Sequence, residues 1–92
     1  MSDEAAGLRD EMAARLRRLL ALRAELGETT FPATVDLDDD PYHAVWEAAQ
    51  FAGIGAFDAQ RLLDQPGTDE RLQLLIAAFD DEITALQTRL SG

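Results

Sequence analysis

The chain has 92 residues, no cysteine and a net charge of −10 at pH 7, and hydrophobic residues make up 47% of it. That length and apolar content predict one domain with one hydrophobic core and exclude a wholly disordered chain. The absence of cysteine excludes disulfides, thiolate metal sites and a cysteine nucleophile, and the acidic balance disfavours nucleic acid, whose phosphates bind basic surfaces.

The first predicted element is a long amphipathic helix over residues 3–26. Ser2 precedes it as a candidate N-cap, and Gly27 follows it at the position where a left-handed residue ends many helices. Its apolar residues follow helical spacing and form a broad stripe: Leu8, Met12, Leu16, Leu19, Leu20, Leu22 and Leu26. Arginines interrupt this stretch, whereas a membrane span needs about 20 mostly apolar residues, so we expect a cytoplasmic protein that enters no membrane.

Residues 28–40 show no helical periodicity and predict a connector. Its threonines and its proline favour extended backbone. We expect three of its apolar side chains to be held against the core: Phe31, Val35 and Leu37.

Asp40 and Pro41 mark the start of a second helix, predicted over residues 41–52. Aspartate is a favoured N-cap, and proline at the first helical position loses no hydrogen bond. Gly53 ends this helix. One face carries four apolar residues: Tyr42, Val45, Trp46 and Ala49.

A third, short helix is predicted over residues 57–64, with Leu62 and Leu63 facing inward, between two turns rich in glycine and proline.

The last helix is predicted over residues 69–90, with Thr68 as its N-cap. Its apolar residues form a heptad seam with gaps of 4, 3, 4, 3 and 4: Leu72, Ile76, Phe79, Ile83, Leu86 and Leu90. Two long and two short helices without strand alternation predict an all-α, compact four-helix bundle in one domain, residues 1–92.

The polar residues predict neither a catalytic site nor a metal site. Four acidic residues share the spacing of calcium ligands in an EF loop: Asp36, Asp38, Asp40 and Glu47. Pro41, however, stands where that loop needs glycine, and a helix that begins there is expected to carry Glu47 away from the loop. One histidine, His43, and no cysteine give neither a zinc site nor a Ser-His-Asp constellation. We therefore expect no enzyme, no cofactor and no metal.

The distribution of charge and the positions of the aromatic residues are the remaining indications of function. The negative charge belongs to residues 27–92, which hold thirteen acidic residues and three arginines, whereas residues 1–26 are neutral overall. Most aromatic side chains are expected in the core. Phe51 lies off the apolar face of its helix, so it either fills a second interface or is exposed to a partner. Trp46 and Phe31 are the other candidates for partner contact.

Three motifs together resemble a known family. Asp39-Asp40-Pro41 opens a helix, residues 58–64 read Asp-Ala-Gln-Arg-Leu-Leu-Asp, and residues 69–72, Asp-Glu-Arg-Leu, enter the last helix. Over residues 8–90 this order is similar to the helical C-terminal part of the Lon protease N-terminal, substrate-binding domain. The residues that carry the likeness are Asp40, Pro41, Asp58, Gln60, Leu63, Arg71 and Leu72.

The resemblance implies a helical bundle that recognises client or partner proteins. It also implies that any protease or ATPase activity lies in other domains of a parent protein; the β-rich first half of the family's domain is absent from this sequence. Read without the resemblance, Arg71 is expected to pair with Asp64 or Asp58 and so to set the angle between the last two helices. Gln60 is expected to bond loop carbonyls.

Two functions are therefore predicted. The first is a non-catalytic protein-interaction module that recognises client or partner proteins. The alternative is a structural bundle that forms homo-oligomers through the first helix or the seam over 72–90. A third possibility, an enzyme or small-molecule binder, would need a well-formed cavity with convergent polar groups. The expected partner is thus a client polypeptide or a second copy of the chain, with no nucleic acid, membrane or metal.

Overall fold

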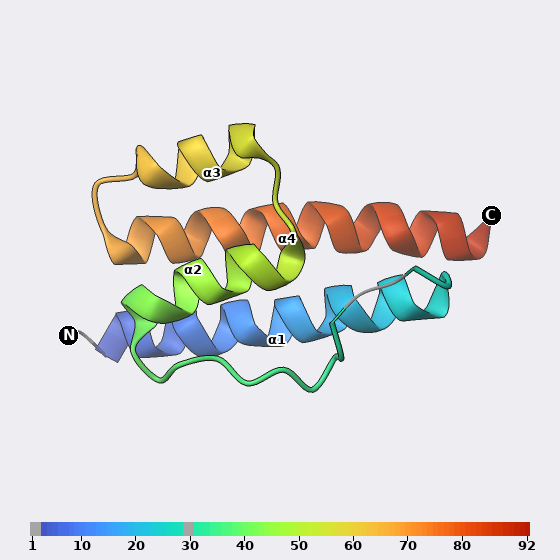
Figure 1. Cartoon of the computed structure of the whole chain (residues 1–92), viewed down its shortest axis with the longest axis horizontal. Coiled ribbons are helices and arrows are strands. Elements are labelled where there is room, and N and C mark those ends of the chain that lie inside the picture. The colour runs from blue at the N-terminus through green and yellow to red at the C-terminus, as the bar shows by residue number, and fades with distance from the viewer. Residues whose placement is uncertain (1–2, 29–30) are drawn as a thin grey trace.

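A computed structural model describes residues 3–28 and 31–92, and this part of the chain forms four helices and no strand (Figure 1). The helices are α1 (Asp3–Glu25), α2 (Pro41–Ala52), α3 (Ala56–Leu63) and α4 (Thr68–Ser91). The predicted all-α class is confirmed, and every predicted helix end lies within one residue of the observed one. The predicted cap at Ser2 lies outside the described residues.

The two long helices, α1 and α4, lie side by side and supply most of the core (Figure 1). Their inward side chains are almost fully buried: Met12, Leu16, Leu19 and Leu20 from α1, and Leu72, Leu75, Phe79 and Leu86 from α4. Of the predicted heptad seam, only Leu90 is exposed, and Ile76 is partly buried. The seam therefore packs within the protein's own core.

Helix α2 packs on both long helices (Figure 1). Its small residues permit a close approach, because Ala44, Val45 and Ala48 are all fully buried. The predicted cap is confirmed: Asp40 accepts a hydrogen bond from the backbone N–H of Tyr42 at 3.1 Å. At the other end, Gly53 has φ of +65°, a left-handed conformation that favours glycine.

Residues 31–40 of the connector run along α1 (Figure 1). Arginines of α1 hold them there by hydrogen bonds. Arg9 Nη2 donates to the Leu37 carbonyl at 2.6 Å, and Arg17 Nε donates to the Val35 carbonyl at 3.3 Å. Leu37 is buried and Val35 is partly buried, as predicted. Phe31 was expected on the core too, but its side chain is 46% exposed.

Helix α3 packs chiefly against α4, on the side away from α1 (Figure 1). Leu62 is fully buried, but Leu63 is 56% exposed, so the prediction that both face inward is wrong. Successive helical residues point about 100° apart, and a short helix that packs on one neighbour buries only one of the two. Thr68 was also wrong as a cap, because Gly67 occupies the N-cap position of α4 without a side-chain bond.

Candidate functional site

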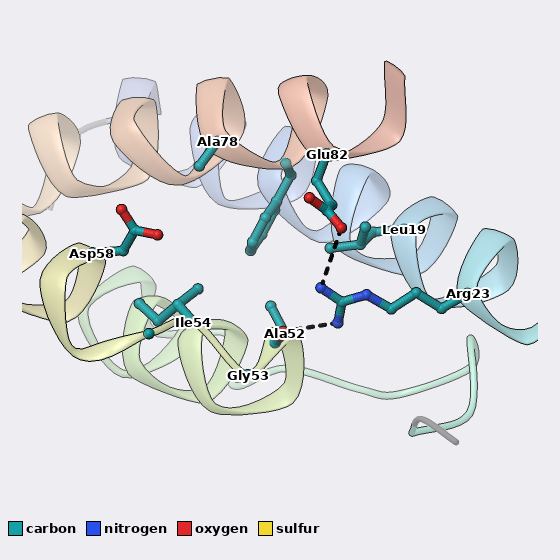
Figure 2. A pocket seen from close by; sticks show the side chains of 10 residues that line it. Leu19, Arg23, Ala52, Gly53, Ile54, Asp58, Ala78 and Glu82 are labelled. Carbon is teal, nitrogen blue, oxygen red and sulfur yellow. Dashed lines mark hydrogen bonds and ion pairs between the residues drawn. The ribbon is translucent and has the colours of Figure 1, made fainter. Parts of the chain in front are cut away.

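An open pocket of about 210 Å³ lies where α1, the α2–α3 turn, α3 and α4 meet (Figure 2). Leu19, Ile54, Ala78 and Phe79 form its apolar lining, and Arg23, Asp58 and Glu82 form its charged lining. In Figure 2 the side chain of Arg23 extends toward Glu82, whereas Asp58 lies on the opposite side.

The charged groups of this pocket already have partners within the fold. Arg23 Nη1 donates to the Ala52 carbonyl at 2.8 Å and so caps the end of α2, while its Nη2 lies 3.9 Å from Glu82. Asp58 lies 3.7 Å from Arg61, one turn further along α3. Small-molecule sites commonly enclose about 300–1,000 Å³, so this open pocket is a weak basis for an enzyme or a small-molecule binder.

The acidic residues before α2 form a hydrogen-bonded turn. The Asp38 carboxylate accepts from the Asp40 N–H at 2.8 Å, and Glu47 Oε1 accepts from the Asp38 N–H at 2.6 Å. Glu47 therefore stays beside the loop, contrary to our expectation, because it lies two turns into α2 on the side that the connector reaches. His43 Nδ1 lies 3.2 Å from Asp40 Oδ2. Within residues 3–28 and 31–92, no group of three or more His, Cys, Asp or Glu side chains is placed to hold a metal ion.

The most distinctive surface feature is a set of three side chains, Tyr42, Trp46 and Arg71, which we call the aromatic surface. Tyr42 and Trp46 lie one turn apart on α2, with ring centroids 6.4 Å apart in an edge-to-face arrangement. The Arg71 guanidinium, from the first turn of α4, lies 5.5 Å from the centroid of the Trp46 ring. Tyr42 is 48% exposed, whereas Trp46 is partly buried against the core.

Arg71 also connects α3 to this surface. Its Nε donates to the carbonyl of Leu62 at 3.1 Å, across the turn between α3 and α4. The predicted pairing of Arg71 with Asp64 or Asp58 is therefore wrong, although Arg71 does hold the two helices together. The same carbonyl also accepts from the Gln65 N–H at 3.3 Å, so Arg71 adds a second hydrogen bond at the end of α3.

Three other residues that carry the likeness to the Lon substrate-binding domain have local structural roles. Gln60 donates to the Asp64 carboxylate at 3.1 Å, so it bonds a side chain one turn ahead and not a loop carbonyl. Leu72 is fully buried, and Pro41 is buried at the start of α2.

Phe31 and Phe51 form a second, separate aromatic pair. Their ring centroids lie 4.9 Å apart in an edge-to-face arrangement, and Phe51 is partly buried against the core. Of the two alternatives for Phe51, the structure favours an internal interface, because the connector places Phe31 over it. Trp46 thus belongs to the aromatic surface, while the other two predicted contact residues lie together elsewhere.

Sequence reasoning placed Tyr42 on the inward face of α2 and missed its exposure. The spacing of Tyr42 and Trp46 shows that they share a face, but not how far α1 and α4 cover it. The position of Arg71 over Trp46 has no local signal at all, because 25 residues separate the two along the chain.

None of the described helices combines the length and apolar composition needed to cross a membrane. No protein-family model, no curated protein and no solved structure matches this chain. The likeness to the Lon substrate-binding domain therefore stays a prediction that rests on the motifs alone.

Proposed function

We propose that this chain is a non-catalytic protein-interaction module and that the aromatic surface is the centre of its contact with a partner polypeptide. The proposal keeps the function that the resemblance to the Lon substrate-binding domain implies, recognition of client or partner proteins in the cytoplasm. It assigns no catalysis to this chain.

The single observation that carries the proposal is the grouping of Tyr42, Trp46 and Arg71 on one surface. Tryptophan, tyrosine and arginine are the residue types most enriched at binding hot spots, where a few side chains provide most of the binding energy. Trp46 and Arg71 hold each other in place, so the conformational entropy lost on binding is small. Tyr42 offers an exposed ring beside this preorganised pair.

The alternative function, a homo-oligomer formed through α1 or the seam over 72–90, has less support. Pairing between copies requires exposed apolar side chains along one of these helices. The inward residues of both are buried against each other within one chain, with only Leu90 of the seam exposed.

A fluorescence titration tests the proposed function directly. Trp46 is the only tryptophan, so its emission reports on this surface without a label. Peptides of about 13 residues that tile an unfolded model protein would be added up to millimolar concentration. We expect some of them to change the emission of Trp46 and to shift the NMR signals of Tyr42 and Arg71.

Two alanine variants then locate the contact. Tyr42→Ala should weaken binding of the best peptide about tenfold or more, the loss typical of a hot-spot aromatic residue. Leu90→Ala is the matched control, since Leu90 is 42% exposed at the far end of α4, and this variant should bind normally. Circular dichroism should show both variants folded. If no peptide produces a signal at millimolar concentration, the proposed function is wrong.

A further inference from the structure

Acidic residues lie on three elements at the end of the molecule that carries the aromatic surface. The N-terminal ends of α2 and α4 and the C-terminal end of α3 lie at the same end of the molecule (Figure 1). Six carboxylates belong to these helix ends and the turns beside them: Asp38, Asp39, Asp40, Asp64, Asp69 and Glu70. We call them the acidic rim.

The acidic rim differs from the other acidic residues in its pairing. Five arginines form ion pairs among the described residues, and their partners are Asp10, Glu11, Glu28, Asp58, Asp80 and Glu82. Asp80, for example, lies 2.8 Å from Arg15 Nε. Within the described chain no arginine forms an ion pair with the acidic rim; His43 lies beside Asp38 and Asp40. Arg9 donates to the backbone carbonyl of Asp38 at 3.1 Å but forms its ion pair with Asp10. Among the described residues, the carboxylates of the rim therefore have no arginine at ion-pair distance.

We propose that the partner segment is basic: it places a lysine or arginine side chain on the exposed ring of Tyr42, at the end of the molecule that carries the acidic rim. This inference rests on the proposed function and specifies the chemistry of its partner. A cation within about 6 Å of an aromatic centroid is attracted to the ring face. Arg71 already lies over Trp46, and the His43 ring lies edge-to-face against Tyr42 with the centroids 5.5 Å apart. Tyr42 is the more exposed of the two aromatic rings of the surface.

The charge of the chain favours this occupant over the others. A second copy brings another net charge of −10, so two aromatic surfaces with their acidic rims repel each other. Anionic phospholipid headgroups and nucleic acid are repelled for the same reason. A basic polypeptide is attracted, and long-range attraction raises its association rate.

Three peptides test the inference. They share one apolar core of about six residues and carry lysine, glutamine or glutamate at both flanks. Trp46 emission and calorimetry measure their affinity. We expect the lysine peptide to bind about tenfold or more tightly than the glutamine peptide, and the glutamate peptide to bind most weakly. Raising the salt concentration from about 50 to about 500 mM should reduce this difference, because salt screens exposed charges.

A pair of double variants separates the acidic rim from overall charge. Asp39→Asn/Asp69→Asn removes two rim charges and should weaken the lysine peptide roughly three- to tenfold while leaving the glutamine peptide unchanged. Glu25→Gln/Asp81→Asn removes the same net charge elsewhere and should have little effect. Asp81 is twelve residues from Asp69 along α4, about 18 Å, which exceeds the screening length of about 8 Å at physiological salt.

The outcomes distinguish the two proposals. If the three peptides bind equally well, the basic partner is wrong and the interaction module stands. If both double variants weaken the lysine peptide equally, the acidic rim is not its binding site and the inference is overturned. If no peptide binds at millimolar concentration, the proposed function fails, and the basic partner fails with it.

Discussion

The two sides of α4 are packed in very different ways. On one side, α1 runs beside α4 (Figure 1). Both helices bury large apolar side chains in the core there. On the other side, the eight-residue helix α3 buries one leucine, Leu62, and is held by the bond from Arg71 to its last turn. One helix thus carries both the stable centre of the molecule and a lightly attached edge.

This difference indicates where a binding surface can lie without disturbing the packed core. Regions that open at low free energy have few buried apolar contacts, and binding surfaces are often found among them. The aromatic surface lies between the tightly packed and the lightly packed side of α4. Its α2 residues belong to the packed side, and Arg71 bonds to α3. The following substitutions test the contrast, from the largest expected effect to the smallest.

Leu20→Ala should destabilise the whole molecule. Leu20 of α1 is fully buried in the core, and leucine-to-alanine changes in such cores cost about 2–5 kcal/mol. Urea unfolding followed by circular dichroism measures the loss, which should appear as one cooperative transition at lower urea. A loss below about 1 kcal/mol would contradict the assignment of α1 and α4 as the stable centre.

Leu62→Ala should loosen α3 more than the rest of the molecule. We expect a loss of about 2 kcal/mol or more, at the lower end of the range for buried leucines, because α3 packs chiefly on α4 and only weakly elsewhere. Hydrogen exchange should show protection falling over residues 56–63 before it falls in α1. Leu63→Ala is the adjacent control and should change stability by less than about 0.5 kcal/mol, since Leu63 is exposed. Equal losses from the two variants would refute the orientation of α3.

Arg71→Ala should cost about 1–2 kcal/mol. It removes the hydrogen bond to the Leu62 carbonyl and the contact with the Trp46 ring. Thermal unfolding and the emission of Trp46 provide two independent measurements. Arg71→Lys should not restore stability, because lysine lacks the planar group that stacks on the ring while donating from Nε.

The comparison for Arg71 is Arg61→Ala, which removes an exposed ion pair with Asp58 at 3.7 Å. Such pairs contribute about 0–1 kcal/mol, and the emission of Trp46 should not change. If Arg61→Ala were the more destabilising variant, the role assigned to Arg71 at the edge of α3 would be wrong.

Gly53→Ala should cost about 1 kcal/mol, because Gly53 has φ of +65° and an added Cβ disfavours that conformation. Open space surrounds the position, so the loss would come from the backbone alone. Gly7→Ala, in the second turn of α1 and also in open space, should instead stabilise by about 0.5–1 kcal/mol through helix propensity. Melting temperatures measured together should move in opposite directions.

The sequence alone determined the four helices and placed each end within one residue, although Thr68 was wrong as the cap of α4. Asp40 with Pro41, Gly27 and Gly53 are local signals whose meaning depends on a few neighbouring residues, and each acts as predicted. The apolar stripes likewise identified most of the core, because helical spacing places those residues on one face. The acidity of residues 27–92 was also visible without a structure.

Only the tertiary structure decided which side chains meet across long distances in the chain. The packing of α3 chiefly on α4 decides that Leu62 is buried and Leu63 is exposed. The position of Arg71 between Leu62 and Trp46 depends on where three helices meet, and no local pattern encodes that. The exposure of Tyr42, and with it the candidate site, depends on how far α1 and α4 cover α2. How far one helix covers another depends on the assembled helices, whereas the spacing of apolar residues and the capping residues belong to each helix alone.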